Sequence, residues 1–136
     1  IMGLDVGDKT IGVALSDPMF LIANPLETIK RKKASLDIQR LVELINENDV
    51  EEIVVGLPKN MNNSIGPQSM KVMSFVDLLK KQTDKEIVYQ DERMTTIQSE
   101  RVLIDMDVRR ENRKEHIDKI AASFILQTYL DRRKNG

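Results

Sequence analysis

The chain has 136 residues, of which 40% are hydrophobic and 32% charged, and its formal net charge is −1. It contains no cysteine, which excludes disulfides, thiolate metal sites and cysteine nucleophiles and favours a reducing cytoplasm. The single histidine excludes an imidazole-rich zinc site, and the overall charge gives no support to nucleic-acid binding. We expect one domain over residues 1–136, with no membrane-spanning helix or signal peptide and with a few residues preceding Ile1.

A β-hairpin is predicted at the start, because two apolar runs within residues 1–17 flank a turn that contains Gly7 and Asp8. Asp5 ends the first of these strands, where a carboxylate is costly to bury unless a positive group meets it. The alternative is that Asp5 only caps the turn. A third strand is predicted over 21–30, and Pro25 favours an edge position for it.

Strands and helices alternate in the middle of the chain. Apolar spacing predicts a helix from Ser35, as its N-cap, to about residue 48, and the apolar run 52–57 predicts a strand covered on both faces. A loop rich in Asn, Gly and Pro follows, and Pro67 is expected in the first turn of a helix that ends near residue 82. Its buried face is expected to comprise Met70, Val72, Met73, Phe75, Val76, Leu78 and Leu79.

The last part of the chain begins with a predicted strand over 86–90, followed by a helix from Thr95 or Thr96 to about residue 105. The charged stretch 107–114 lacks apolar spacing and is expected to be a mobile loop. A periodic helix from about 115 to 133 should then pack on the sheet. An opening meander followed by alternating strands and helices predicts an α/β fold around a mixed sheet.

Three acidic residues lie at informative places, namely Asp5, Glu92 after the strand 86–90, and Asp118 near the start of the last helix. Ala121 and Ala122 would let that helix approach the sheet closely. Three converging carboxylates repel one another unless cations neutralise them, and Mg²⁺ or Mn²⁺ prefers such oxygen ligands. Paired ions of this kind support phosphodiester cleavage. Alternatively, Glu92 pairs with Arg93 at the surface, and Asp118 only interacts with the helix dipole.

Four segments of this chain resemble the YqgF family, whose members are described as Holliday-junction-resolvase-like proteins and as nucleases of small-subunit ribosomal RNA precursors. These segments are GLDVGDKTIGVALSD at 3–17, VVGLPKNMNNSIGPQ at 54–68, DERMTT at 91–96 and DKIAASFILQTYL at 118–130. The resemblance implies a ribonuclease H-like fold with a mixed five-stranded sheet flanked by helices. It also implies that Asp5, Glu92 and Asp118 are catalytic carboxylates that bind divalent metal.

This chain departs from the family pattern in two respects. It has Asn62-Asn63 where the family often carries Asp-Gly, and it offers three carboxylates where several relatives have four. In the implied fold, strand-end loops would bring cationic and amide groups to substrate phosphates. These expected substrate-binding residues are Lys9, Lys59, Asn60 and Arg93. A basic arm that closes on nucleic acid is expected from Arg109, Arg110, Arg113 and Lys114.

The resemblance therefore implies a metal-dependent endonuclease of structured nucleic acid, first of all one that processes the 5′ end of pre-16S ribosomal RNA in the cytoplasm. The alternatives are a Holliday junction resolvase and a non-catalytic nucleic-acid-binding factor in transcription or ribosome assembly. A sugar-kinase or actin-like ATPase is disfavoured, because those proteins bind nucleotide between two related domains. RNA or branched DNA as substrate, and a monomer or a homodimer, stay open at this point.

Overall fold

The structure is a computed structural model. It describes the backbone of residues 1–57, 66–91 and 110–135, and the side chains within 1–57, 66–90 and 119–133. Residues 58–65 of the loop expected over 58–67 lie outside these ranges, as does the helix expected over 95–105. The same holds for Glu92, Arg93, Lys59 and Asn60.

Five strands form one sheet with the order β3-β2-β1-β4-β5. The strands are β1 (Met2–Val6), β2 (Thr10–Ser16), β3 (Ala23–Lys30), β4 (Glu52–Leu57) and β5 (Glu86–Asp91). β1 pairs antiparallel with β2 and parallel with β4, and β4 pairs parallel with β5. The mixed five-stranded sheet implied by the sequence is therefore confirmed.

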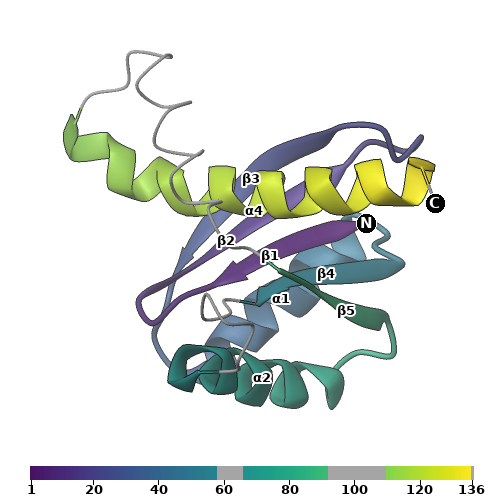
Figure 1. Cartoon of the computed structure of the whole chain (residues 1–136). Helices are drawn as coiled ribbons and strands as arrows, with labels where there is room; N and C mark the ends of the chain where they lie inside the picture. Colours follow the sequence, from purple (N-terminus) through teal and green to yellow (C-terminus); the bar gives the residue numbers. More distant parts are fainter. Residues whose placement is uncertain (58–65, 92–109, 136) are drawn as a thin grey trace.

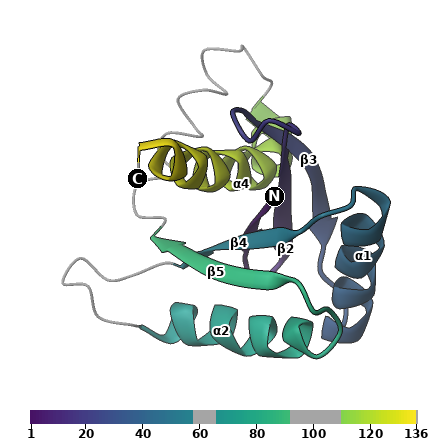
Figure 2. The same cartoon turned by 90° about the vertical axis from the view of Figure 1, so that its right-hand side faces the viewer.

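The helices cover the two faces of the sheet. α1 (Ala34–Glu47) and α2 (Pro67–Lys80) lie on one face, and α4 (Arg110–Asn135) lies on the other (Figures 1 and 2). Alternation along β1 explains the two cores, because successive side chains point to opposite faces. Met2, Leu4 and Val6 join the core on the side of α1 and α2, whereas Val54 of β4 packs with Ala122 and Leu126 of α4 on the other face.

β3 is an edge strand, as Pro25 predicts. Pro25 faces Ala14, and the register between β2 and β3 shifts at Val13/Ala14. A proline has no N–H to donate to the ladder, so it is tolerated at an edge and beside such an irregularity.

The predictions about the start of α1 and the buried face of α2 are wrong in part. The N-cap of α1 is Lys33 and not Ser35, and no side chain caps it. Instead, the buried Asp37 accepts the backbone N–H of Lys32 at 3.1 Å. In α2, Met70 and Leu78 are exposed by 62% and 42%, because the apolar residues of this helix extend beyond the face that contacts the core.

α4 begins at Arg110, so residues 110–114 are helical and not the mobile loop that the sequence predicts. Arginine, lysine and glutamate are good helix formers. Apolar periodicity reveals only a helix with one face buried against the protein core, so it gives no signal for a helical segment without such a face. The expected flexible basic arm is therefore wrong for these residues.

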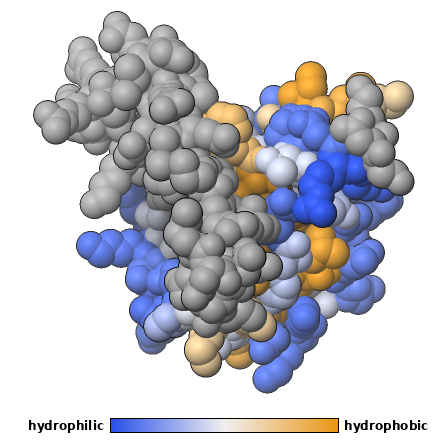
Figure 3. All heavy atoms as spheres, viewed as in Figure 1, coloured by the Kyte–Doolittle hydropathy of each residue, from blue (hydrophilic) through white to orange (hydrophobic). Residues whose placement is uncertain are grey.

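The β2–β3 connection carries an apolar loop. Its four consecutive residues Met19, Phe20, Leu21 and Ile22 are exposed by 74%, 40%, 50% and 59%. Asp17 organises this loop, because its carboxylate accepts the backbone N–H groups of Met19, Leu21 and Ile22. Figure 3 shows hydrophobic residues at the upper right of this face, where the β2–β3 connection lies in Figure 1. No helix in the described ranges is long and apolar enough to cross a membrane.

Candidate functional site at the carboxyl edge of the parallel strands

The three parallel strands bring their carboxyl ends to one edge of the sheet. Leu4 of β1 pairs with Val55 of β4, and Leu57 of β4 pairs with Asp91 of β5. Glu92 follows Asp91 directly in the sequence, although it lies outside the described residues. The backbone of β5 thus ends, at Asp91, at the same edge of the sheet as Asp5, with β4 between β1 and β5. Ligands commonly bind at such an edge in open α/β sheets.

Asp5 lies near the end of β1 and is half-buried. By alternation it shares the face of Gly3, which is the face covered by α4. This contact is close, since a Cβ added to Gly3 would lie 2.7 Å from Cβ of Leu126 and 2.9 Å from the carbonyl oxygen of Ala122. The expectation that small residues let the last helix approach the sheet is confirmed for Ala122.

α4 runs antiparallel to β1 (Figure 1). Late in the helix, the Tyr129 hydroxyl donates a hydrogen bond to Glu52 at the start of β4, whereas Ala122 lies earlier, over Gly3. Residue 118 is one helical turn before Ala122, which is about 6 Å along the axis. Asp5 is two strand residues beyond Gly3, about 7 Å along β1 in the same direction. The backbone therefore brings residue 118 toward the Asp5 end of β1, while the side chain of Asp118 lies outside the described ranges.

Lys9 belongs to the turn that joins β1 to β2, and its side chain is exposed. The turn is closed by the Gly7 N–H, which donates to the carbonyl of Thr10 at 2.9 Å. Lys9 thus lies at the same end of β1 as Asp5. The other three predicted substrate-binding residues, Lys59, Asn60 and Arg93, lie outside the described residues. Among the side chains that the structure describes, no three histidines or carboxylates are grouped so that they could hold a metal ion.

The sequence analysis missed the residues that hold this turn. Arg31 follows β3 directly, and its Nη1 donates to the carbonyl of Gly7 at 2.8 Å. Its Nε donates to Asp37 at 3.3 Å, and its guanidinium lies 4.9 Å from the centre of the Phe75 ring. Asp8 of the same turn pairs with Lys71 of α2 at 3.5 Å. No spacing rule reveals these contacts, because each joins residues from separate elements.

The other end of α4 is also tied to the sheet. Burial, together with the hydrogen bond to Glu52, raises the pKa of Tyr129 to about 12, so its hydroxyl stays protonated and remains a donor near neutral pH. Gln127 accepts the Ala23 N–H and donates to the Leu21 carbonyl, each at 2.9 Å. These contacts fix the C-terminal half of α4 against β3 and β4.

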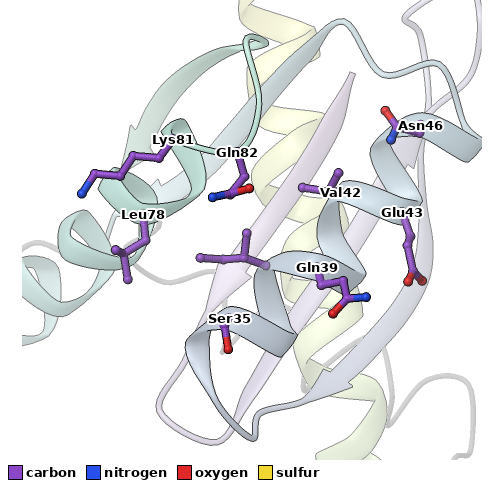
Figure 4. Close-up of a pocket in the computed structure, with 9 residues that line it drawn as sticks. Ser35, Gln39, Val42, Glu43, Asn46, Leu78, Lys81 and Gln82 are labelled. Atoms are coloured by element: carbon purple, nitrogen blue, oxygen red, sulfur yellow. The ribbon is translucent and has the colours of Figure 1, made fainter.

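A hollow of about 610 Å³ lies between α1 and α2, on the face opposite α4 (Figure 4). Val42 and Leu78 border it together with polar side chains such as Gln39 and Gln82. It contains none of the predicted site residues, so the carboxyl edge of the parallel strands remains the better candidate site.

The fold of this chain resembles that of two solved resolvase structures. It matches the Thermus thermophilus RuvC structure in complex with a Holliday junction substrate with a TM-score of 0.61, over 98% of this chain and 94% of that chain, at 15% identity. It matches the fowlpox virus resolvase in complex with Holliday junction DNA with a TM-score of 0.56, over 97% of both chains, at 14% identity. These likenesses show the ribonuclease H-like fold that the YqgF resemblance implies.

The family follows from the sequence. The model of the RuvX family, described as Holliday junction resolvase, matches residues 1–132, and the chain belongs to this family, which confirms the YqgF resemblance. A relative from Thermoanaerobacter pseudethanolicus is 56% identical over 136 residues, covering 99% of this chain and 98% of its own. One from Clostridium tetani is 53% identical over 131 residues, covering 96% and 95%. Both are named "Putative pre-16S rRNA nuclease".

Proposed function

We propose that this protein is a metal-dependent endonuclease, a hydrolase that cuts phosphodiester bonds at the 5′ end of pre-16S ribosomal RNA. The observation that carries this proposal is the identity above 50%, over nearly the full length of both chains, with relatives named as nucleases of that precursor. The cytoplasm, expected from the sequence, is the compartment that we propose for this activity.

We assign the catalytic and metal-binding roles to Asp5, Glu92 and Asp118. Their donor set consists only of carboxylate oxygens, which fits Mg²⁺ or Mn²⁺. The half-buried position of Asp5 beside α4, at an edge where parallel strands end, supports this assignment. Bound divalent cations would supply Lewis-acid activation of water and charge stabilisation for phosphodiester hydrolysis.

The chain's own cations and amides would bind the nucleic-acid backbone around these carboxylates. We assign this role to Lys9, Lys59, Asn60 and Arg93. Lys9 is supported by its exposure in the turn after β1. Arginine can bind phosphate through two parallel hydrogen bonds, so Arg93 would orient the substrate more strictly than a lysine.

A Holliday junction resolvase is the second candidate, and it is favoured because the matching family is described as Holliday junction resolvase. Cutting a four-way junction requires two strands to be cut, which a homodimer with two sites would achieve. The ribosomal RNA precursor requires only one site, so a monomer would suffice. Sedimentation of the protein with and without each substrate separates these two assemblies.

The testing experiment uses two labelled substrates, the 5′ end of a ribosomal RNA precursor and a four-way DNA junction, each with Mn²⁺. Wild type is compared with Asp5→Asn, and with Asp84→Asn as a control at a side chain that is 93% exposed. We expect cleavage of the RNA, lost in Asp5→Asn and retained in Asp84→Asn.

Other results would redirect the assignment. Cleavage of the junction alone, with the same dependence on Asp5, would identify a resolvase. Binding of either substrate without cleavage under Mg²⁺ or Mn²⁺ would identify a non-catalytic nucleic-acid-binding factor. Cleavage by Asp5→Asn at the wild-type rate would contradict the assigned role of Asp5.

A further inference from the structure

We infer that Arg31 is a positioning residue of this site, which holds the β1–β2 turn in place so that Asp5 and Lys9 keep their positions at the carboxyl edge. The inference rests on the proposed function and deepens it. Arg31 is not one of the predicted site residues, but it fixes the β1–β2 turn, which belongs to the candidate site.

Arg31 holds the turn through two separate groups. Its backbone N–H donates to the carbonyl of Lys9 at 2.9 Å, and its Nη1 donates to the carbonyl of Gly7 at 2.8 Å. The two carbonyls lie on either side of Asp8 in the turn. A charged donor makes a stronger hydrogen bond than a neutral one, so the guanidinium bond is the stronger of the two.

The guanidinium is itself fixed by α1 and α2. Its Nε donates to Asp37, whose side chain is only 3% exposed, and its face lies over Phe75 at 4.9 Å. Asp37 is held in turn by the Lys32 N–H at 3.1 Å. Arg31 is 23% exposed, so these bonds are shielded from much of the competing water.

Arg31 acts from the face opposite to the carboxylate. Asp37 and Phe75 belong to α1 and α2, on one side of the sheet, whereas Asp5 shares the face of Gly3 beneath α4. Arg31 therefore supports the turn from behind, without a place among the groups that meet the substrate.

Lysine cannot replace Arg31 in this geometry. The guanidinium reaches Asp37 with Nε and Gly7 with Nη1 while its plane lies over Phe75. An ammonium is a compact charge on a flexible stem, and it cannot make the two bonds with one planar group. The ion pair of Asp8 with Lys71 also ties the turn to α2, but it joins side chains that are 60% and 64% exposed, and such surface pairs contribute little to stability.

The test compares Arg31→Lys with Arg40→Lys in the full chain. Arg40 makes a similar set of bonds, to Glu27 at 2.7 and 2.9 Å and to Glu43 at 3.1 Å, but these involve only β3 and α1. Amide hydrogen exchange of Gly7 is the first readout, since its N–H closes the turn. The Mn²⁺ concentration for half-maximal cleavage and the KM for nucleic acid at saturating Mn²⁺ are the second.

In Arg31→Lys we expect the Gly7 amide to exchange roughly tenfold faster or more, as for the loss of a charge-assisted hydrogen bond, while core amides keep their rates. We expect the required Mn²⁺ concentration and the KM for nucleic acid both to rise several-fold, because Asp5 and Lys9 lose their fixed positions together. Arg40→Lys should leave both readouts at wild-type values. Wild-type Gly7 exchange in a folded Arg31→Lys protein would overturn the inference, as would equal effects of the two variants.

Asp37→Asn is a second, milder variant that keeps the shape of the anchor if Arg31→Lys does not fold. It should change the Gly7 exchange rate in the same direction and by a smaller factor, and an unchanged rate would overturn the inference. If wild type cleaves no substrate, the proposed function fails while the exchange readout still decides whether Arg31 holds the turn. Suppose that wild type cleaves, and that the variant has a faster Gly7 exchange but the same Mn²⁺ requirement as wild type. That result would overturn only the claim that the turn positions the site.

Discussion

α4 lies very close to β1 at Gly3. A methyl group added there would meet Cβ of Leu126 and the carbonyl of Ala122 at 2.7 and 2.9 Å. Both are atoms that no side-chain rotation can move, so the helix itself would have to shift. The absence of a side chain at Gly3 therefore sets the distance between the element that carries Asp118 and the strand that carries Asp5.

Gly3→Ala should thus lower the free energy of unfolding by about 1–3 kcal/mol, the usual cost of overpacking a core. We also expect a loss of cleavage larger than this destabilisation explains, because the backbone of residue 118 would move away from Asp5. Urea unfolding and single-turnover cleavage measure the two effects. Ile45→Val, in the core on the other face, is the control, with a stability cost of about 1 kcal/mol and little effect on cleavage.

Asp17 links the stability of the β2–β3 connection to pH. The N–H groups of Ile22, Leu21 and Met19 hold the pKa of Asp17 below its ordinary value, because they favour the charged form. A lowered pKa in the folded protein gives stability that is present above the ordinary pKa near 4 and is lost as the pH falls through the lowered value.

Asp17→Asn should therefore be less stable than wild type at neutral pH, and the difference should shrink as the solution is acidified below about pH 4. Urea midpoints of both proteins over this pH range measure the difference. Asp84→Asn is the control, since its exposed side chain has no such set of backbone donors. A difference that stays constant with pH would contradict the assigned cause.

At the scale of elements, the start of α1 depends on Asp37 and not on Ser35. Asp37→Ala should lower the free energy of unfolding by about 2 kcal/mol, because it leaves the half-buried Arg31 without its carboxylate and Lys32 without its acceptor. Ser35→Ala should change it by less than about 0.5 kcal/mol. Thermal unfolding of the two variants measures the contrast, and equal costs would restore Ser35 as the cap.

Sequence reasoning succeeded where local chemistry decides the structure. The apolar run 52–57 matches β4, and Pro67 opens α2 as its fixed backbone angle favours. It failed at Arg110, since a helical turn without apolar spacing gives no periodic signal. It also passed over Arg31, whose partners Gly7 and Phe75 become neighbours only in the folded chain.

The candidate site was predictable to the same extent. The position of Asp5 at a strand end follows from the pattern around it, and the shared edge follows from the parallel pairing of β1, β4 and β5. The small residue Ala122 led us to expect that α4 lies close to the sheet. The role of Gly3 in this contact was not expected, because a lone glycine in a strand does not reveal which element approaches it.

At the scale of the whole molecule, metal and fold stability should be coupled. If three carboxylates converge, they repel one another in the metal-free protein, and a bound divalent cation stabilises the folded state by mass action. Mn²⁺ should therefore raise the Tm of wild type. In the absence of metal, Asp5→Asn should have a higher Tm than wild type. Its Tm should rise little when Mn²⁺ is added.

Scanning calorimetry with a series of Mn²⁺ concentrations measures this coupling. At a concentration about 100 times Kd, the gain in wild type should be about 2.7 kcal/mol. Asp84→Asn should respond as wild type does. An equal rise of Tm in Asp5→Asn would mean that Mn²⁺ binds elsewhere on the protein.

α4 follows all five strands in the chain, and it covers the sheet face to which Ala14 and Val54 belong. During synthesis, the ribosome releases the strands before this helix exists, so that apolar face stays open until α4 emerges. The helix that closes it also carries Asp118. A nascent or prematurely terminated chain without α4 therefore lacks both the cover and a proposed catalytic carboxylate, and activity is expected only once α4 has been synthesised and has folded onto the sheet.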